Sequence, residues 1–321
     1  MKQGLSIIIV NFNGAAFIEK CVFSFQHFLL ESNIEHEFLI IDNASTDDSV
    51  GIIKELAVKL PNIKPFFSKT NYGFGKANNL MAAEANYTTV VLLNNDTYTL
   101  DLRNLCDATK RCYLNKDTVY TCNILNSDHS KQKNSFGYPR LTNVVVDLFL
   151  LKKPLFFLYK KLFKAKLDVI DGYYSGCYLV MNLELFNKSG GFDTDFFFYH
   201  EECDLFIRLE KIGIKKAYLQ DRIIHYGSGG AGISDFSFKN YYTNLARLLI
   251  KNGYGSSRFI KLLFRVAFKF RVLLLKLGFN IPYSPFAHMY KYGESAPILN
   301  SHITSLHNET LASIDDLYVK E

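Results

Sequence analysis

The sequence predicts an α/β fold: a Rossmann-like, mostly parallel sheet flanked by helices, with a helical appendage at the C-terminal end. In the first half of the chain, short apolar segments alternate with longer amphipathic ones. One of the apolar segments, Val90-Val91-Leu92-Leu93, is uninterrupted, as buried strands of parallel sheets usually are. This alternation of strand and helix favours parallel strands joined by right-handed crossovers.

The elements of the first half follow from that alternation. Strands are expected over residues 5–10, 37–41, 63–68 and 88–93, and helices over 15–30, 47–60, 74–85 and 100–113. Ser45 or Thr46 is expected to cap the second helix. A further strand is expected over 119–125, followed by a polar loop over 126–133.

Regular patterns return after residue 170. We expect strands over 174–181 and 214–219 and a helix over 201–211, then a glycine-rich, flexible loop over 227–232, helices over 238–251 and 256–277, and a tail containing Pro and Ser. A boundary near Asp235 would separate a domain over 1–235 from a helical C-terminal region over 236–321.

The composition of the chain is that of an ordinary globular protein. Its 321 residues are 48% hydrophobic and 21% charged, with a formal net charge of +6. The six cysteines are scattered without CxxC or zinc-ligand spacing, which favours a reduced, cytoplasmic location. We expect neither a signal peptide nor a spanning helix, which needs about 18 apolar residues.

Polar residues, and one glycine among them, follow four of the predicted strands. They are Asn11 and Asn13; Asp42 and Asn43; Asn71, Gly73 and Lys76; and Asn94, Asn95 and Asp96. If the strands are parallel, these residues share one edge of the sheet, where α/β proteins bind ligands. A carboxylate there can hold a divalent metal, and the metal can hold a diphosphate. The preference of Asn and Asp for turns is the alternative explanation.

The sequence lacks two common phosphate-binding loops. The first strand is followed by Asn11-Phe12-Asn13-Gly14 rather than by GxGxxG, and Gly73-Phe74-Gly75 is a single GxG in another place. A Walker loop is also absent. We therefore expect a metal rather than a glycine-rich turn to hold any phosphate.

Three acidic residues, Glu201, Glu202 and Asp204, follow an aromatic run and open a predicted helix. Negative charge in a first helical turn is favoured by the helix dipole, so capping is one interpretation. A carboxylate beside an aromatic wall can also have the raised pKa that suits a general base. Asp204 and Arg208 are four residues apart, as a helix-face ion pair requires.

Two further positions are candidates for binding. His225 ends a strand-like segment before the glycine-rich loop, and a neutral imidazole is a common metal ligand. A structural or solvated His is the alternative. Gly176 can allow close approach of a ligand, although a turn or bulge would equally require glycine.

Six segments of the chain together resemble the inverting family 2 glycosyltransferases of the rhamnosyltransferase-like branch, which have the GT-A fold. The matching residues are 6–13, 42–47, 71–75, 93–96, 199–205 with Arg208, and His225. Each motif is weak by itself. Their common order over about residues 5–230 makes the resemblance specific.

The resemblance implies a role for each candidate. Asp42 and the region of Asn11 would hold the nucleotide within a donor half over about 1–120. Asp96 would coordinate Mg²⁺ or Mn²⁺ on the donor diphosphate, with His225 as a further ligand. In an acceptor half over about 168–235, Glu202 or Glu201 would be the general base, and Gly176, Tyr199 and Asp204 would lie near the acceptor.

Two departures from the family pattern are relevant. The metal motif is often Asp-x-Asp, but its first position here is Asn94. The base motif is usually Glu-Asp, but here it is Glu201-Glu202, and the longer second side chain moves the carboxylate by about one bond length. A catalytically impaired homologue and a non-catalytic nucleotide- or carbohydrate-binding module therefore remain alternatives.

The resemblance implies transfer of a hexose, with rhamnose as one candidate, to a lipid-linked or polysaccharide acceptor in cell-surface glycan synthesis. The segments 152–164 and 261–276 mix cations with bulky apolar residues, a pattern typical of helices in an anionic membrane interface. Lys261, Arg265, Lys269 and Arg271 are expected to reach lipid phosphates, which would place the protein on the inner face of the cell membrane. An ordinary packed surface helix is the alternative. No nucleic-acid partner is expected.

Overall fold

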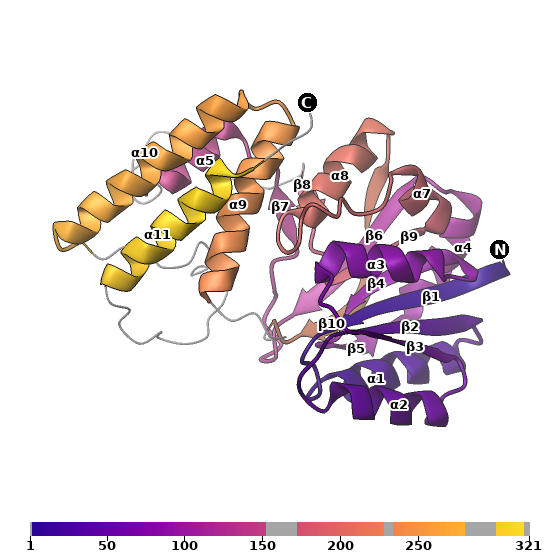
Figure 1. Cartoon of the computed structure of the whole chain (residues 1–321). Coiled ribbons are helices and arrows are strands. Elements are labelled where there is room, and N and C mark those ends of the chain that lie inside the picture. The colour runs from indigo at the N-terminus through magenta and orange to yellow at the C-terminus, as the bar shows by residue number, and fades with distance from the viewer. Residues whose placement is uncertain (1, 152–171, 228–233, 280–299, 318–321) are drawn as a thin grey trace. The chain divides into compact units, whose positions relative to one another are not determined.

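The computed structural model describes residues 2–151, 172–227, 234–279 and 300–317 (Figure 1). The chain divides into two compact units. The first comprises Met1–Phe136 with Tyr173–Gly232, and the second comprises Gly137–Gly172 with Ile233–Glu321. Residues 137–151 thus group with the C-terminal helices, although the expected boundary near Asp235 placed them with the sheet.

The first unit is built on an eight-stranded sheet in the order β3-β2-β1-β4-β9-β6-β10-β5. The strands are β1 (Lys2–Asn11), β2 (His36–Asn43), β3 (Ile63–Ser68), β4 (Tyr87–Asn94), β5 (Thr97–Asp101), β6 (Thr118–Leu125), β9 (Tyr178–Asn182) and β10 (Lys215–His225). β1 to β4 are parallel, and β6 is parallel to β10. β9 runs antiparallel to both β4 and β6, and β5 runs antiparallel to β10. The predicted mostly parallel sheet is confirmed.

These directions bring distant segments of the sequence to one edge of the sheet. Six strands end there, and the two antiparallel strands, β9 and β5, begin there. The register places Asn11 beside Asp42 and Val10 beside Asn94. The expected common edge for the polar strand ends is therefore confirmed for β1, β2 and β4.

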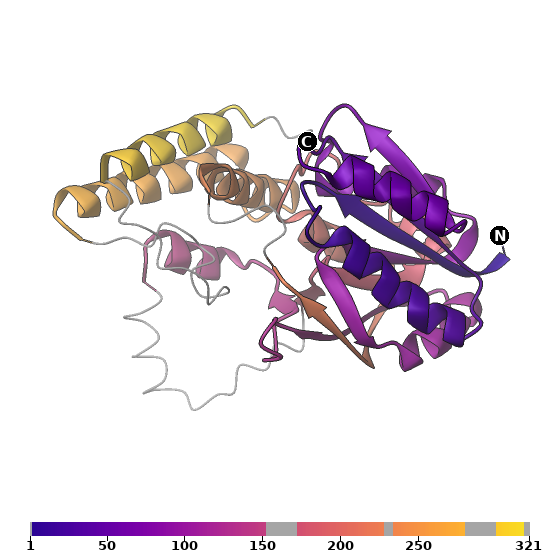
Figure 2. The same ribbon diagram turned by 90° about the horizontal axis from the view of Figure 1, so that it is seen from below.

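Helices cover both faces of the sheet (Figures 1 and 2). They are α1 (Ile18–Glu31), α2 (Ser49–Lys59), α3 (Gly73–Ala83), α4 (Arg103–Leu114), α7 (Leu183–Lys188) and α8 (Glu201–Lys211). Alternate residues of β1, such as Ile7 and Ile9, share one core cluster with Phe25 of α1 and Leu105 of α4. The period of two along each strand turns the intervening residues to the other face, which α3 covers.

Three local expectations were wrong. Residues 97–101 form β5, so the helix predicted from residue 100 begins only at Arg103. The strand predicted over 174–181 is two strands, β8 (Gly172–Tyr174), which pairs with β7 (Ser135–Gly137), and β9. Neither Ser45 nor Thr46 caps α2. Ser45 instead accepts hydrogen bonds from Asn13 and Asn11, and Asp47 accepts one from the Ser49 amide.

The second unit is helical, with α5 (Leu141–Leu148), α9 (Asp235–Lys251), α10 (Ser257–Lys276) and α11 (Asn300–Asp315). Ser234 and Ser256 cap α9 and α10 through their side-chain oxygens. A cluster of buried aromatic residues, Phe238, Tyr242, Phe264 and Phe268, forms the core. α11 lies in the region expected to be a tail, and it packs beside α9 and α10 (Figure 2).

One of the cations expected to reach lipid is buried. Arg271 is 2% exposed and donates to the backbone oxygens of Leu148 and Asp147 and to the Tyr242 hydroxyl. The prediction that it binds lipid phosphate is wrong, because the guanidinium joins α10 to α5 and α9. The basic segment 152–164 lies outside the described residues. Among the described helices, none is long and apolar enough to cross a membrane.

Candidate active site at the strand ends

The first strand ends in a buried polar network. The Asn11 amide donates to the Asp42 carboxylate over 3.0 Å and accepts from the Asn95 amide over 2.7 Å. The second Asp42 oxygen accepts from the Ser45 backbone N–H over 3.0 Å. Gly14 makes this arrangement possible, because a Cβ there would lie 1.9 Å from the Asn95 amide nitrogen. Three strand ends and one loop are thus locked together.

A second network orders the entry to α3. The Asn43 amide donates to the Asn71 side chain over 2.8 Å and to the Gly73 backbone oxygen over 3.2 Å, and it accepts from the Tyr72 N–H over 2.8 Å. Gly73 has a φ of +76°, which glycine adopts readily, and its site lies against the Phe197 backbone. The two networks place the residues of β1, β2 and α3 that were predicted to bind the nucleotide sugar along one edge of the sheet.

Asp96 and His225 meet at the same edge. His225 Nε2 lies 3.3 Å from Asp96 Oδ1 and 3.2 Å from the amide nitrogen of Asn94. Both Asp96 and Asn95 are buried. The Tyr226 N–H donates to the Asp96 backbone oxygen over 3.0 Å, so the end of β10 is tied directly to the segment after β4. The structure therefore brings together the two residues predicted to bind metal.

The chemistry of this pair fits a divalent ion. Adjacent ligands of an octahedral ion, each about 2.1 Å from the metal, lie about 3 Å apart, close to the 3.3 Å separation here. Across the part of the chain that the structure describes, no three His, Cys, Asp or Glu residues are grouped as a metal site. The protein thus offers two such ligands here, and a substrate diphosphate and water would have to complete the shell.

The two glutamates at the start of α8 lie in different surroundings. Glu202 Oε1 accepts a hydrogen bond from the Gly176 N–H over 3.1 Å. Glu201 is 2% exposed, and its Oε2 atom has no hydrogen-bond partner among the described residues. Burial raises the pKa of Glu201 well above its ordinary value, and the charge of Glu202 raises it further. Burial also raises the pKa of Glu202, opposed by the N–H groups of Glu202 and Gly176.

A short segment before β9 connects the two carboxylate sites. Gly176 holds Glu202, and the backbone oxygen of the next residue, Cys177, accepts from the Asn94 N–H over 3.0 Å. Burial raises the pKa of the Cys177 thiol to about 12, and the charges of Asp96 and Glu202 both add to this effect. Asp96 and Glu202 are therefore both neighbours of the buried residue Cys177.

The remaining predicted residues are Asn13, Lys76, Tyr199 and Asp204. Asn13 has a φ of 50° and accepts from the Thr46 N–H, while Lys76 is exposed, with its ammonium 4.7 Å from the Tyr72 ring centre. Tyr199 has a φ of 71°, and its ring centre is 4.3 Å from that of Phe198. The expected Asp204–Arg208 ion pair is present at 2.8 Å.

Gln132, whose side-chain oxygen lies 2.7 Å from His225 Nδ1, was not among the candidate residues, because a polar loop carries no periodic signal. The glycine-rich loop predicted over 227–232 lies, after Gly227, outside the described residues.

The fold and this polar edge define a protein of the class that binds ligands at the carboxyl ends of an α/β sheet. Residues 6–189, more than half of the chain, match the family model described as Glycosyl transferase family 2. The chain therefore belongs to glycosyl transferase family 2. Glu201, Glu202 and His225 lie beyond the matched residues.

One relative and two solved structures show what the chain is similar to. An uncharacterized glycosyltransferase of Nostoc sp. (strain PCC 7120) is 34% identical over 93 residues, which span 29% of this chain and only 28% of that protein. The mannosyltransferase PcManGT from Pyrobaculum calidifontis, in complex with GDP-Man and Mn²⁺, has a TM-score of 0.53 at 13% identity, covering 98% of this chain and 86% of that chain. GalNAc-T7, with UDP, GalNAc and Mn²⁺, also has a TM-score of 0.53 at 13% identity, covering 96% and 54%. The fold is GT-A, as the sequence predicted.

Proposed function

We propose that this protein is a metal-dependent, inverting glycosyltransferase that moves a hexose from a nucleoside diphosphate sugar to an acceptor hydroxyl. Family membership supports the reaction class. The two structural neighbours named above were solved with GDP-Man or UDP and with Mn²⁺, which supports a nucleotide donor and a divalent ion. The rhamnosyltransferase-like pattern of the motifs makes rhamnose one candidate sugar.

The donor would lie along the two buried networks. Asp42 and the Asn11 region would bind the base and ribose, with Asn13, Asn43, Asn71 and Gly73 shaping the same edge. Lys76, which is exposed, would contact a donor phosphate or sugar. Asn94 and Asn95 would orient the diphosphate beside Asp96.

Asp96 and His225 would hold Mg²⁺ or Mn²⁺ on the donor diphosphate. When bound there, the ion would neutralise the negative charge that develops on the leaving nucleoside diphosphate. The protein's part is to fix the two ligands: β10 holds His225, and the backbone bond from Tyr226 holds the Asp96 segment.

Glu202 would be the general base. Glu202 is half-buried and its carboxylate is held by Gly176, whereas Glu201 is enclosed and has a pKa raised well above the ordinary value, which favours its neutral form. Glu202 would remove the acceptor proton as the hydroxyl oxygen attacks the anomeric carbon from the face opposite the leaving group. That geometry inverts the anomeric centre and needs no covalent intermediate. Gly176 and Tyr199 would border the acceptor, whereas Asp204, the third residue predicted there, is fully buried and paired with Arg208.

The single observation that carries this proposal is the connection between the two sites. Cys177 receives the Asn94 N–H beside the metal-site candidate, and its neighbour Gly176 donates to Glu202. A base must lie next to the donor's reactive carbon, and the diphosphate must lie beside the metal ligands. Gly176 and Cys177, which are adjacent, bind the proposed base and the segment beside the metal ligands, respectively.

A thermal-shift screen of nucleotide sugars, with and without Mn²⁺, tests the donor proposal. We expect one nucleotide class to raise the melting temperature only when Mn²⁺ is present. Transfer or slow hydrolysis of that donor then distinguishes an enzyme from a binding module or an impaired homologue. A stabilised protein that releases no nucleoside diphosphate would support the binding module.

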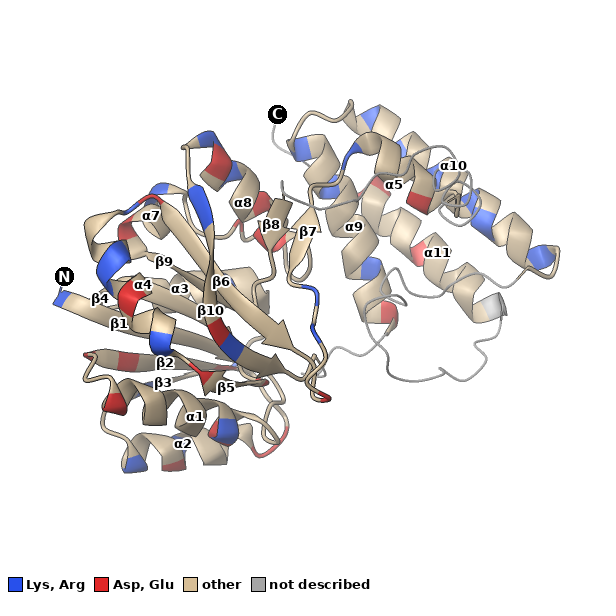
Figure 3. Cartoon of the chain, turned by 180° about the vertical axis from the view of Figure 1, so that it is seen from behind, with Lys and Arg blue, Asp and Glu red and all other residues tan. Residues whose placement is uncertain are grey.

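We also propose that α10 brings the protein to an anionic membrane surface, where a lipid-linked or polysaccharide acceptor for cell-surface glycans would be found. The exposed residues of α10 and its C-cap combine cations with large apolar side chains: Arg258, Lys269 and Lys276 with Phe259, Leu262, Val266, Leu273 and Leu277, while Arg265 is paired with Asp315. Figure 3 shows the basic residues recurring along this helix. Such a face suits lipid headgroups.

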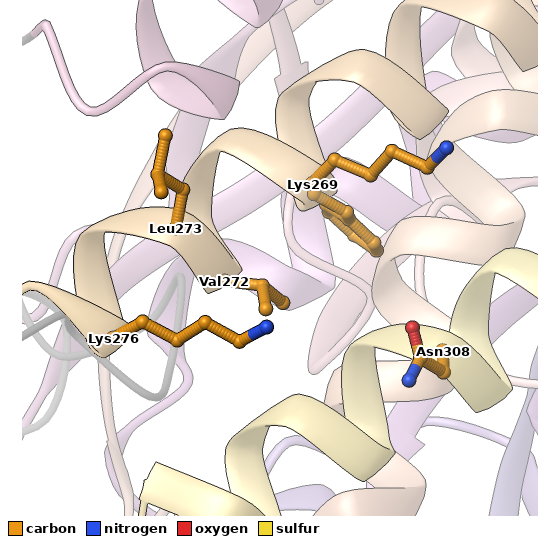
Figure 4. A pocket seen from close by; sticks show the side chains of 6 residues that line it. Lys269, Val272, Leu273, Lys276 and Asn308 are labelled. Carbon is orange, nitrogen blue, oxygen red and sulfur yellow. The ribbon is translucent and has the colours of Figure 1, made fainter.

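A hollow of about 220 Å³ between α10 and α11 lies on the same face, lined by Phe268, Lys269, Val272, Leu273, Lys276 and Asn308 (Figure 4). Because Lys269 and Lys276 are exposed and line this hollow, they are the residues to replace in a test. Replacing both with Gln should weaken binding to anionic vesicles at low salt, while replacing Lys188 and Lys211 of the first unit with Gln should not. Equal vesicle binding by both variants would contradict a membrane role for α10.

A further inference from the structure

The loop that follows β6 places a glutamine against the ring of His225. Gln132 Oε1 lies 2.7 Å from His225 Nδ1, and Gln132 Nε2 donates to the His225 backbone oxygen over 3.3 Å. The Gln132 N–H donates to the Ile124 oxygen over 2.9 Å, so the backbone of this residue is also fixed. The side chain therefore has a definite position beside the imidazole.

A chain of hydrogen bonds fixes which end of the Gln132 amide faces the histidine. Gln132 Nε2 donates to Asn126 Oδ1 over 2.8 Å, and Asn126 Nδ2 donates to Ser130 Oγ over 2.9 Å. The Ser130 hydroxyl donates to Asp128, whose same oxygen accepts the Ser130 N–H over 2.9 Å. An ionised carboxylate only accepts hydrogen bonds, so every donor in the chain points toward Asp128.

This direction determines which ring nitrogen of His225 carries the hydrogen when the imidazole is neutral. With Gln132 Oε1 as the acceptor, Nδ1 carries the hydrogen, and the Nε2 of a neutral imidazole keeps its lone pair. Nε2 is the atom that lies 3.3 Å from Asp96 Oδ1, and the Asn94 amide nitrogen, 3.2 Å away, can donate to it. A histidine that binds metal through one nitrogen generally donates through the other to a fixed acceptor.

We propose that Gln132, held by the chain through Asn126 and Ser130 to Asp128, is a positioning residue that keeps His225 in the Nδ1–H tautomer with Nε2 directed at the Asp96 site. For the neutral imidazole, the tautomer follows from the hydrogen bonds alone. Its use for a divalent ion rests on the function proposed above.

Two variants separate this role from simple packing. Gln132→Glu keeps an acceptor opposite His225 Nδ1 but loses both donor bonds, to Asn126 and to the His225 oxygen. Gln132→Met has a side chain of similar length but keeps neither the acceptor nor the two donor bonds. If Gln132 served only to hold the loop, both variants would behave alike. If Gln132 sets the tautomer, His225 keeps the Nδ1–H tautomer in Gln132→Glu and loses it in Gln132→Met.

The first measurement is long-range ¹H–¹⁵N NMR of the histidine rings at pH 8, in protein without added metal. We expect the Nδ1–H tautomer of His225 in the wild type and in Gln132→Glu, and a mixture of tautomers in Gln132→Met. His225→Gln assigns the signal. An Nε2–H tautomer in the wild type, or unchanged tautomers in Gln132→Met, would overturn the proposal.

The second measurement is Mn²⁺ binding, followed by the loss of the free Mn²⁺ EPR signal in the presence of UDP or GDP. Gln132→Met should bind Mn²⁺ about 10- to 100-fold more weakly, and Gln132→Glu should stay close to the wild type. Equal losses in both variants would overturn the positioning role. A wild-type protein that binds no Mn²⁺ with either nucleotide would contradict the proposed function instead, and the tautomer would still be decided by NMR.

Discussion

The carboxylate of Glu202 and the backbone N–H of Gly176 are joined by a 3.1 Å hydrogen bond between the first turn of α8 and the segment that enters β9. A Cβ at residue 176 would lie 2.7 Å from Glu202 Oε1 and 2.9 Å from Glu202 Cγ. Glycine is required here by the closeness of the carboxylate, and not by an unusual backbone angle. The position of the proposed base thus depends on the absence of a side chain at residue 176.

Gly176→Ala should therefore lower turnover by at least about 10-fold, because a misplaced base loses its hydrogen-bond reach to the acceptor proton. Donor binding should be unchanged. The control is Gly51→Ala in α2, where a Cβ meets nothing within 4 Å. Steady-state kinetics with calorimetric donor titration checks both variants, and a fully active Gly176→Ala protein would show that Glu202 does not act from this position.

Glu202→Gln should reduce turnover by at least about 100-fold while donor binding survives, because the base is lost but its size is kept. Glu201→Gln should retain much more activity, because Gln resembles the neutral acid that burial favours at this position. A dead Glu201→Gln protein with an active Glu202→Gln protein would reverse the two roles. If both variants are active, neither glutamate is the base.

The rate should also depend on pH. Because burial raises the pKa of Glu202, its basic form is populated only above the ordinary carboxyl range, and kcat/KM should fall on acidification at an apparent pKa above 4.5. The measurement is kcat/KM between pH 4.5 and 9 at saturating Mn²⁺. A profile that is flat down to pH 4.5 would contradict a base in this environment.

Asp221→Asn should stabilise the protein at neutral pH. Asp221 is fully buried, and burial raises its pKa to about 6 from 3.8, despite hydrogen bonds from Asn104. The folded state thus holds a proton that the unfolded chain loses between about pH 3.8 and 6, so its contribution to stability falls as the pH rises through that window.

At pH 7.5 we expect Asp221→Asn to increase the free energy of unfolding by up to about 3 kcal/mol, and below pH 4 the gain should disappear. Asp107→Asn, an exposed carboxylate on α4, is the control. Urea unfolding at both pH values gives the comparison. A gain that is the same at pH 3.8 and 7.5 would mean that the Asp221 charge is not its cause.

The strand ends could be predicted from the sequence because an apolar run that stops at Asn or Asp is a local signal, and parallel strands bring such signals to one edge. The direction of β9 could not be predicted, since the sequence of an apolar strand does not show whether it runs parallel or antiparallel to its neighbours. That direction is what places Gly176 and Cys177 beside Asn94. Gln132 was missed because its role depends on a contact across 93 residues.

The sequence predicted only in part which residues of α10 are exposed. Lys269 lies on the exposed side, but Arg271 follows two residues later, about 200° around the helix, and enters the core. Its burial depends on acceptors from α5 and α9, which the α10 sequence does not reveal. α11 was missed for a similar reason, because its helix is stabilised by packing against α9 and α10.

The most direct test of the central claim is the Mn²⁺-dependent release of nucleoside diphosphate from the donor selected by thermal shift, compared between the wild type and Asp96→Asn. We expect release by the wild type that requires Mn²⁺ and is abolished by a chelator. Asp96→Asn keeps the shape of the side chain but loses its charge, so it should lose both the release and the Mn²⁺-dependent binding of the donor. Release that persists in Asp96→Asn, or that proceeds equally well without a divalent ion, would contradict the assignment of this edge as a metal-dependent glycosyl transfer site.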